Sequence, residues 1–309
     1  MRQKYFPKLL FLCGPTAVGK SEIAAIIAKK LNGEIISCDS MQIYKGMDIL
    51  TSQPAQALRK KAAHHLIAVI SPCAEYDASK YCRLATNKIS EIVKKGKTPL
   101  VTGGTGLYMS LLVDGIFKNK PDEAIRRRLY ESAQKHGAAP LYKKLSEVDP
   151  EAAGKIHPND TRRIVRALEV FESTGKPISL LQKTRKGLKD KYDIRIFCLN
   201  MPRQALYKRI EGRVEKMFDQ GLVEEARRLL RKNLSTTAYR AIGIREIEGH
   251  LNGAYDLNTA KQMIARNSCL YAKRQLTWFR KDKRIKWINL ETEYNPRGIA
   301  QKIWKEFSL

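Results

Sequence analysis

The chain has 309 residues, and a hydrophobic share of 43% is enough to bury a core that suits one large domain or two unequal ones. Wholesale disorder is therefore excluded, and no apolar stretch approaches the roughly 20 residues of a membrane-spanning helix. Lys and Arg outnumber Asp and Glu by 58 to 31, and the resulting charge of +27 is spread along the chain. An excess this large opposes compaction by self-repulsion, so it favours a polyanionic partner over an ordinary basic surface.

Cysteine and histidine usage gives no sign of a structural metal. The six cysteines are scattered, without the Cys-x-x-Cys pair of a zinc or redox site, so we expect them to be reduced. His64 and His65 are neighbours, and on a strand such neighbours point to opposite faces. No signal-peptide pattern is present. We therefore expect a cytoplasmic protein without a structural metal.

The predicted elements begin with an alternation of strands and helices. Residues 8–13 form a short apolar run that ends at Gly14, as a strand buried on both faces does, and residues 22–31 show helical spacing. The next predicted elements are strands at 34–38, 65–70 and 98–102 and an amphipathic helix at 79–95. This alternation predicts an α/β fold, a parallel sheet flanked by helices.

From about residue 119 the strand signals stop and helical patterns follow one another. The helices predicted there are 122–134, 140–148 and 160–173. Strand signals return later, giving strands at 194–200 and 284–289 and helices at 203–220, 223–232 and 257–281. We therefore predict a core domain of residues 1–117 and 181–309, interrupted by an inserted, mainly helical domain of residues 118–180.

Residues 14–21 read GPTAVGKS and match the phosphate-binding pattern G-x-x-x-x-G-K-[ST]. The match lies between a predicted strand and a predicted helix, where backbone N–H groups and the helix N-terminus form an anion site. Lys20 adds a positive charge there, and Ser21 can bind Mg²⁺. The predicted ligand is a diphosphate or triphosphate, bound by Gly14, Pro15, Thr16, Ala17, Val18, Gly19, Lys20 and Ser21.

The ligand need not be ATP. A P-loop ATPase usually ends a later strand with an aspartate that holds Mg²⁺, whereas the strand at 98–102 runs into Gly103-Gly104-Thr105-Gly106. The absence of this aspartate argues against a motor ATPase, although small-molecule kinases can also lack it. Asp39 follows the strand at 34–38 and is expected at the carboxyl edge of the sheet, beside the phosphate loop. There it can act as a base, as a cap, or as a partner of Lys20.

A series of motifs resembles the tRNA dimethylallyltransferases, also called tRNA isopentenyl transferases. Besides the phosphate loop, they are DSMQIYKGMD at 39–48, HHLI at 64–67, GGTGLY at 103–108, IHPND at 156–160, RRIVRALE at 162–169 and YAKRQLTWFR at 271–280. The resemblance runs almost from end to end. It implies a P-loop NTPase-like parallel sheet with a helical insert.

The family resemblance implies transfer of a dimethylallyl group from dimethylallyl diphosphate to N6 of the adenosine 3′-adjacent to the anticodon of certain tRNAs. That amine is a weak nucleophile, so the enzyme must stabilise the departing diphosphate and accept a proton. By resemblance, Lys20 and Ser21 with Mg²⁺ serve the diphosphate, Arg213 reaches it from outside the loop, and Asp39 accepts the proton. The expected substrate-positioning hydroxyls are those of Thr16 and Thr105.

The resemblance also implies tRNA contacts in four segments. They are Asp39, Ser40, Met41 and Gln42; Arg162, Arg163, Ile164, Val165 and Arg166; Arg240, Ala241, Ile242, Gly243, Ile244 and Arg245; and Lys273 with Arg274. Two positions depart from the family pattern, because Ile244 replaces a usual tyrosine and Ser268-Cys269 replaces a Thr-Arg pair. Both departures affect the fine tRNA contacts more than the reaction. The basic stretch 261–286 is expected to bind RNA phosphates, with Trp278 on the core face of its helix.

Three alternatives stay open at this point: a small-molecule kinase, a non-catalytic RNA-binding module with a nucleotide switch, and an adenylate prenyltransferase that uses free AMP or ATP as acceptor. The charge of +27 favours tRNA over a mononucleotide. The expected partners are tRNA, through its anticodon stem-loop, and dimethylallyl diphosphate, with Mg²⁺ as cofactor. We expect a monomer that holds the RNA between its two domains, with the adenosine extruded from its stack.

Overall fold

The computed structural model describes residues 6–117, 119 and 122–309. Contacts within the chain define two compact units, one of Met1–Val113 with Leu188–Leu309 and one of Asp114–Gly187. The predicted insert, 118–180, lies inside the second of these ranges, and its first residue falls outside the described residues. In the described part of the chain, every helix is too short or too polar to span a bilayer.

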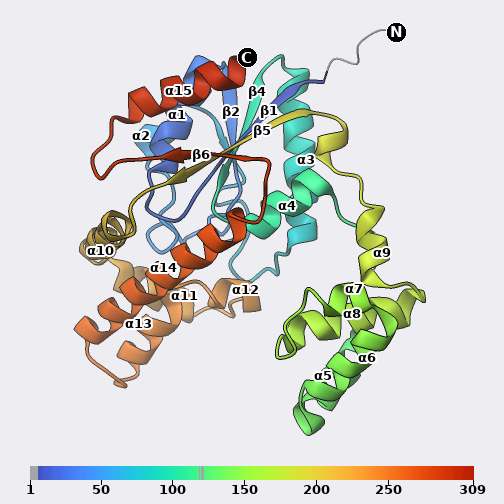
Figure 1. The fold of residues 1–309 in the computed structure, drawn as a ribbon. Coiled ribbons are helices and arrows are strands. Elements are labelled where there is room, and N and C mark those ends of the chain that lie inside the picture. Colours follow the sequence, from blue (N-terminus) through green and yellow to red (C-terminus); the bar gives the residue numbers. More distant parts are fainter. Residues whose placement is uncertain (1–5, 118, 120–121) are drawn as a thin grey trace, which may run out of the picture. The chain divides into compact units, whose positions relative to one another are not determined.

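The first unit is built on a parallel sheet whose described strands are ordered β3-β2-β4-β1-β5-β6 (Figure 1). The strands are β1 (Lys8–Cys13), β2 (Gly33–Ser37), β3 (His64–His65), β4 (Thr98–Gly103), β5 (Asp193–Asn200) and β6 (Ile285–Asn289). β1 lies between β4 and β5 and is buried from Leu9 onward, as its apolar run predicts. The loop that follows β1 is therefore central at the carboxyl edge of the sheet.

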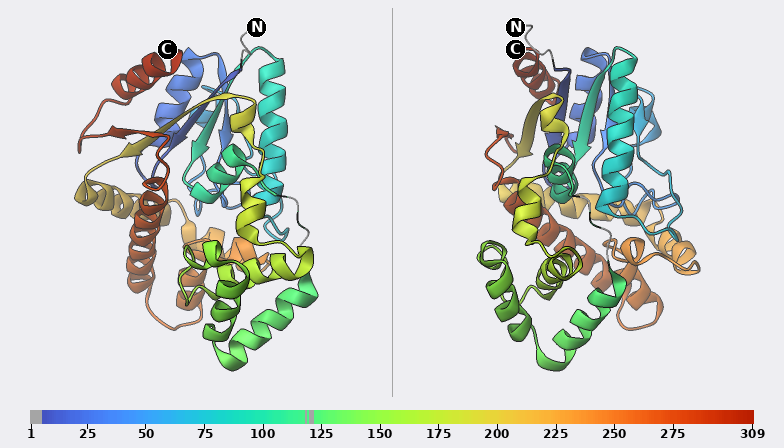
Figure 2. Two further views of the ribbon diagram at one scale, coloured as in Figure 1. Left: turned by 45° about the vertical axis from the view of Figure 1, so that its right-hand side comes forward. Right: turned by 90° about the vertical axis from the view of Figure 1, so that its right-hand side faces the viewer.

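Helices cover both faces of this sheet. The helices of this unit, some of which lie beyond the carboxyl edge of the sheet rather than on its faces, are α1 (Lys20–Lys30), α2 (Gln56–Arg59), α3 (Ala78–Lys94), α4 (Gly106–Asp114), α10 (Arg203–Asp219), α11 (Leu222–Leu230), α12 (Thr236–Tyr239), α13 (Ile244–Leu251), α14 (Leu257–Phe279) and α15 (Pro296–Ser308), with a short 3₁₀ helix at Leu188–Asp190. Leu10 and Leu12 of β1 share a core with α1 and α15. Phe11 points to the other face, where it lies beside Met109 of α4. In the right-hand view of Figure 2, α15 and α3 lie on opposite sides of the strands.

The first unit differs from the sequence-based prediction at β3 and at several helices for which no element is predicted, among them α2, α4 and α15. β3 is only His64–His65, shorter than the predicted 65–70, because Leu66 and Ala68 adopt φ values of 61° and 50° that interrupt an extended strand. Ile70 still makes an isolated parallel bridge to Tyr44. The segment 236–251, for which no element is predicted, forms the short helices α12 and α13.

The second unit is helical in its described residues and has its own core. Its helices are α5 (Glu123–His136), α6 (Ala139–Val148), α7 (Pro150–Ala153), α8 (Thr161–Thr174) and α9 (Ile178–Lys183). Leu145, Ile164 and Leu168 are fully buried in that core. Glu169 is 0% exposed and forms ion pairs of 3.1 Å with Nη2 of Arg126 and with Nη1 of Arg166. Buried carboxylates of this kind are tolerated only when paired.

A buried carboxylate also joins two strands of the first unit and the segment that leads into a third. Glu34 of β2 is 4% exposed and accepts hydrogen bonds from Lys97 Nζ at 2.8 Å and from His65 Nε2 at 2.7 Å. The hydrogen bond from Lys97, opposed by burial and helped by the one from His65, holds the pKa of Glu34 at about 2. The ionised carboxylate thus fastens the edge strand β3 and the segment before β4 to β2.

Glu34→Gln is expected to destabilise the protein at neutral pH by roughly 2 kcal/mol, because the folded-state pKa lies below the ordinary value. The sign follows from linkage: the stabilisation is full above the unfolded pKa near 4.3 and is lost as pH falls toward about 2. Melting temperatures of the two proteins should therefore differ most at pH 6–7 and converge below pH 4. A difference that is independent of pH would show that the carboxylate charge is unimportant.

Candidate functional site

The loop Gly14–Gly19 connects β1 to α1 and has the geometry of a phosphate cradle. Gly14 and Gly19 have φ values of 146° and 98°, and a Cβ on Gly14 would lie 2.8 Å from the carbonyl oxygen of Leu199. Lys20 Nζ donates to the carbonyls of Gly14 at 3.0 Å and Pro15 at 2.7 Å. Burial, partly offset by the charge of Asp39, lowers the pKa of Lys20 to about 8.

Two residues from distant parts of the chain hold the outer side of this loop. Arg209 Nε donates to the carbonyl of Ala17 at 3.0 Å, and Tyr294 Oη donates to the carbonyl of Val18 at 3.0 Å. The guanidinium of Arg209 also lies 5.4 Å from the centre of the Tyr294 ring. Sequence reasoning missed both residues, because neither belongs to a recognisable motif.

Thr16 is held by both its backbone and its side chain. Its N–H donates to Gln275 Oε1 at 2.8 Å, and Gln275 Nε2 donates to the carbonyl of Gly104 at 2.9 Å. Its hydroxyl accepts a hydrogen bond of 2.6 Å from Arg213 Nη1. Arg213 Nε is buried and has no hydrogen-bond partner among the described residues. A buried N–H without a partner costs free energy, so an acceptor in this pocket would be favoured.

Asp39 follows the end of β2. One of its carboxylate oxygens accepts hydrogen bonds from the backbone, and the other accepts none from the described residues. Oδ1 accepts from the N–H groups of Met41 at 2.9 Å and Gln42 at 3.3 Å, whereas no described residue donates to Oδ2. The adjacent N–H of Ser40 donates to Thr105 Oγ1 at 3.2 Å. Within the described residues, Asp39 forms no ion pair with Lys20 at 4.0 Å or less. Asp39 therefore orders a turn and still presents a free oxygen.

Two cavities meet at these residues. The phosphate-loop pocket has a volume of about 310 Å³ and includes Lys20 and Ser21 in its wall. The adjoining pocket has a volume of about 250 Å³ and is lined by Arg240 and Arg274 among others. The residues that line both pockets are Thr16, Asp39, Thr51, Ser52, Arg213 and Tyr271. An anion in the first pocket and a ligand in the second would thus be separated only by side chains at this junction.

Comparison with known proteins identifies the family of this chain. The family model described as IPP transferase matches residues 42–282. The chain is 43% identical to the tRNA dimethylallyltransferase of Geobacter sulfurreducens over 301 residues, which is 96% of this chain and 97% of that relative. The chain belongs to the tRNA dimethylallyltransferase family. A second member, from Carboxydothermus hydrogenoformans, is 45% identical and is covered over 97% of both chains.

A solved structure of the family supports the fold. The tRNA isopentenylpyrophosphate transferase from Bacillus halodurans superimposes with a TM-score of 0.71 at 37% identity, covering 97% of this chain and 98% of that one. The predicted α/β fold with a parallel sheet is thereby confirmed.

The tRNA-contacting residues that the family resemblance implies are partly gathered at the adjoining pocket. Those that line it are Asp39, Ser40, Met41, Arg240, Ala241, Ile242 and Arg274. Gln42 lines the phosphate-loop pocket instead. Its Oε1 accepts from Ser37 Oγ at 3.0 Å, and its Nε2 donates to the carbonyls of residues 51 and 52. Lys273 lies elsewhere on α14 and lines a third pocket.

Some of the other residues that the resemblance implies as tRNA contacts are buried or packed against protein groups. Ile164, Val165 and Ile244 are at most 1% exposed, so their side chains serve packing. The neighbouring Arg162, Arg163 and Arg245 are exposed. Gly243 has a φ of 110° and packs against Leu50, and the exposed Arg245 stacks on a tyrosine ring.

The prediction that Trp278 lies on the core face of its helix is wrong. Its side chain is 36% exposed and covers Gly106, where an added Cβ would lie 2.2 Å from the indole.

The three arginines of α8 differ in their freedom to bind RNA. Arg162 is exposed and has no acidic partner among the described residues. Arg163 Nε lies 3.3 Å from Asp160, at the exposed start of the helix. Arg166 Nη1 lies 3.1 Å from Oε1 of the buried Glu169, without the geometry of a hydrogen bond, so Arg166 has a structural partner as well.

Proposed function

We propose that this chain transfers a dimethylallyl group from dimethylallyl diphosphate to N6 of the adenosine 3′-adjacent to the anticodon of tRNA and releases diphosphate. The observation that carries this proposal is the junction of two pockets at Asp39, Thr16 and Arg213. One pocket offers a phosphate cradle and the other offers arginines and apolar walls. A prenyl donor and an adenine base in these pockets would meet beside the free oxygen of Asp39.

The donor diphosphate is assigned to the phosphate-loop pocket. Lys20 and the unpartnered Nε of Arg213 supply positive charge where negative charge develops as the C–O bond breaks. Ser21 lines the same pocket, and its hydroxyl has no hydrogen-bond partner among the described residues, so it suits Mg²⁺, which takes few protein oxygens and completes its shell with phosphate and water. When bound, Mg²⁺ would neutralise charge on the diphosphate.

The acceptor adenosine is assigned to the adjoining pocket. As the N6 lone pair forms a bond to C1 of the dimethylallyl group, the C–O bond breaks, its electron pair leaves with the diphosphate, and N6 must lose a proton. Oδ2 of Asp39 is the group that we assign to accept this proton. Thr105 positions the turn that carries Asp39 through its hydrogen bond to Ser40. The base must leave its stack to reach this pocket.

Mass spectrometry of tRNA nucleosides tests this function. Incubation with dimethylallyl diphosphate, Mg²⁺ and unmodified tRNA should yield prenylated adenosine and free diphosphate, and ATP in place of the donor should yield no phosphorylated product. Efficient prenylation of free AMP would instead identify an adenylate prenyltransferase. We further propose that the enzyme is cytoplasmic and acts as a monomer. Analytical ultracentrifugation of the free and tRNA-bound protein would check the oligomeric state.

Replacing Arg162 and Arg163 together by Ala is expected to raise the tRNA KM without changing the KM of the donor. Each lost phosphate contact should reduce the log–log salt dependence of tRNA binding by about 0.7–0.9. Arg166 is kept in this variant, because its partner Glu169 is buried. Binding measured between 50 and 300 mM salt gives the slope.

The exposed Arg127 of α5 offers a matched control, since it is paired only loosely with Glu131 at 4.0 Å. Arg127→Ala should leave the slope unchanged. An equal loss in both variants would mean that general charge, rather than a site on α8, attracts the RNA.

A further inference from the structure

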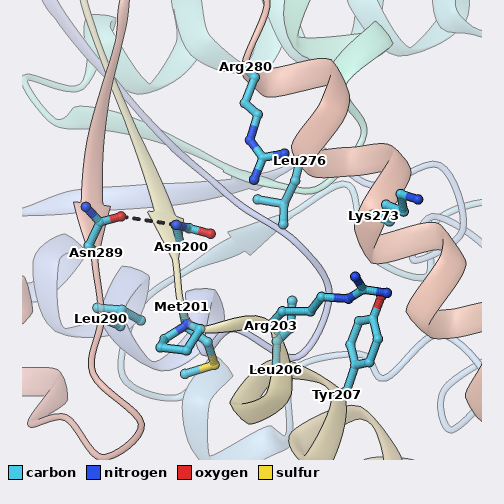
Figure 3. Close-up of a pocket in the computed structure, with 11 residues that line it drawn as sticks. Asn200, Met201, Arg203, Leu206, Tyr207, Lys273, Leu276, Arg280, Asn289 and Leu290 are labelled. Atoms are coloured by element: carbon cyan, nitrogen blue, oxygen red, sulfur yellow. Dashed lines mark hydrogen bonds between the residues drawn. The ribbon is translucent and has the colours of Figure 1, made fainter.

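A third pocket lies in the first unit at the carboxyl ends of β5 and β6 (Figure 3). Its volume is about 580 Å³, within the range of small-molecule sites. The residues that form it come from the two strand ends, the start of α10 and one face of α14. The buried Met201, Leu206 and Leu290 give it an apolar floor. Neither the donor nor the acceptor adenosine is assigned to this space, although the family resemblance implies a tRNA contact for Lys273 on its wall.

The wall of this pocket is strongly basic. Arg203, Lys273 and Arg280 line it, and the set of lining residues contains no Asp or Glu. None of the three forms an ion pair with a described carboxylate at 4.0 Å or less. The guanidinium of Arg203 rests on the ring of Tyr207 at 5.1 Å, which holds it at the wall. Three like charges around one cavity repel one another, and a bound anion would relieve that repulsion.

The pocket also presents an oriented amide. Asn200 Nδ2 donates to Asn289 Oδ1 at 3.1 Å, and Figure 3 shows the oxygen of Asn200 turned away from Asn289, toward the side where Leu276 lies. No described residue donates to that oxygen. An amide oxygen of this kind can accept a hydrogen bond from the exocyclic amine of a base.

The third pocket and the two functional pockets lie on opposite faces of α14. Lys273, Leu276 and Arg280 follow one another at helical spacings of three and four residues, so they share a face. The residues that α14 contributes to the functional pockets include Ser268, Tyr271 and Gln275, which share another face, about 150° away. A tRNA held in the adjoining pocket would therefore have the helix between it and the third pocket.

We propose that the third pocket is a separate binding site for a small nucleotide. Its phosphate is held by Arg203, Lys273 and Arg280, and its base and sugar lie over the apolar floor, with the oxygen of Asn200 accepting from an amino group of the base. The basic wall, the apolar floor and the free amide oxygen of Asn200 match the three parts of such a ligand. The position on the far face of α14 favours a free nucleotide over a nucleotide of the tRNA substrate.

Isothermal titration calorimetry with AMP tests this proposal on the full-length protein, with diphosphate and Mg²⁺ present at saturation so that the phosphate loop is filled. AMP should bind under these conditions, and Arg203→Glu with Arg280→Glu should weaken it by roughly tenfold or more. Asn200→Leu should weaken AMP but not ribose 5-phosphate, and adenosine should bind poorly. Arg297→Glu, a charge reversal of an exposed arginine on α15, is the matched control and should change nothing. Retained diphosphate binding shows that each variant is folded.

Three results would overturn the proposal. AMP binding that disappears when diphosphate is added, or in Lys20→Ala, would place AMP in the phosphate loop. AMP affinity that is unchanged by the double charge reversal would show that AMP binds outside this pocket. Absence of AMP binding together with a raised tRNA KM in the double variant would assign the pocket to an RNA phosphate.

Discussion

Asp39→Asn is expected to lower the rate of prenyl transfer by about 10²–10⁴ while tRNA affinity changes little. The amide keeps an oxygen that can accept from the N–H groups of Met41 and Gln42, so the turn at the end of β2 should survive. It cannot take up the proton that leaves N6. The substitution therefore removes the base and preserves the shape, which separates chemistry from binding.

Single-turnover measurement of prenylated tRNA gives this rate without a contribution from product release. Asp48→Asn, an exposed change in the same loop, is the matched control and should be nearly silent. If Asp39→Asn retains a rate close to that of the native protein, Asp39 is not the proton acceptor, and its function is limited to ordering the turn.

Lys20→Ala should reduce turnover by roughly 10²–10³, because it removes the ammonium that faces the departing diphosphate. Donor affinity should fall as well, while tRNA binding in the absence of donor should be unaffected. Lys29→Ala, near the exposed end of α1, removes the same charge from the same helix and serves as the control. Equal effects of the two substitutions would contradict a specific role for Lys20.

Because the pKa of Lys20 is lowered, Lys20→Ala should also change how the donor KM depends on pH. In the free protein, burial lowers this pKa to about 8, and a bound diphosphate must raise it again. Donor binding is therefore favoured while the lysine is protonated, and the donor KM should rise as pH increases through about 8. In Lys20→Ala this rise should be absent between pH 7 and 9.5.

Local patterns predicted the central part of the fold and the phosphate loop. The apolar run of β1, the glycine-rich turn and the helical spacing of α1 are neighbours in sequence, so one short window contains the whole signal. The position of Asp39 at a strand end followed from the rule that parallel strands meet at one edge.

The missing parts depend on contacts between distant segments. Arg209 and Tyr294 bind the phosphate loop from positions 192 and 276 residues further along the chain than the residues they contact. The sequence around each of them contains no motif that predicts this contact. The interruption of β3 at Leu66 arises at a non-glycine residue, where sequence gives no warning of a positive φ. The error at Trp278 has a similar origin, because α14 carries pockets on two faces and has no single solvent side.

The side chain of Gln275 ties together three segments that folding brings to one point: α14, the phosphate loop through Thr16, and the glycine turn after β4. An added Cβ at position 104 would lie 2.0 Å from Gln275 Nε2, so Gly104 can gain a side chain only if the glutamine is shortened or withdrawn. Substitution of Gly104 is thus conditional on a change at Gln275, although 171 residues separate them. In the evolution of such a sequence, a side chain at position 104 is therefore expected only together with, or after, a change at position 275.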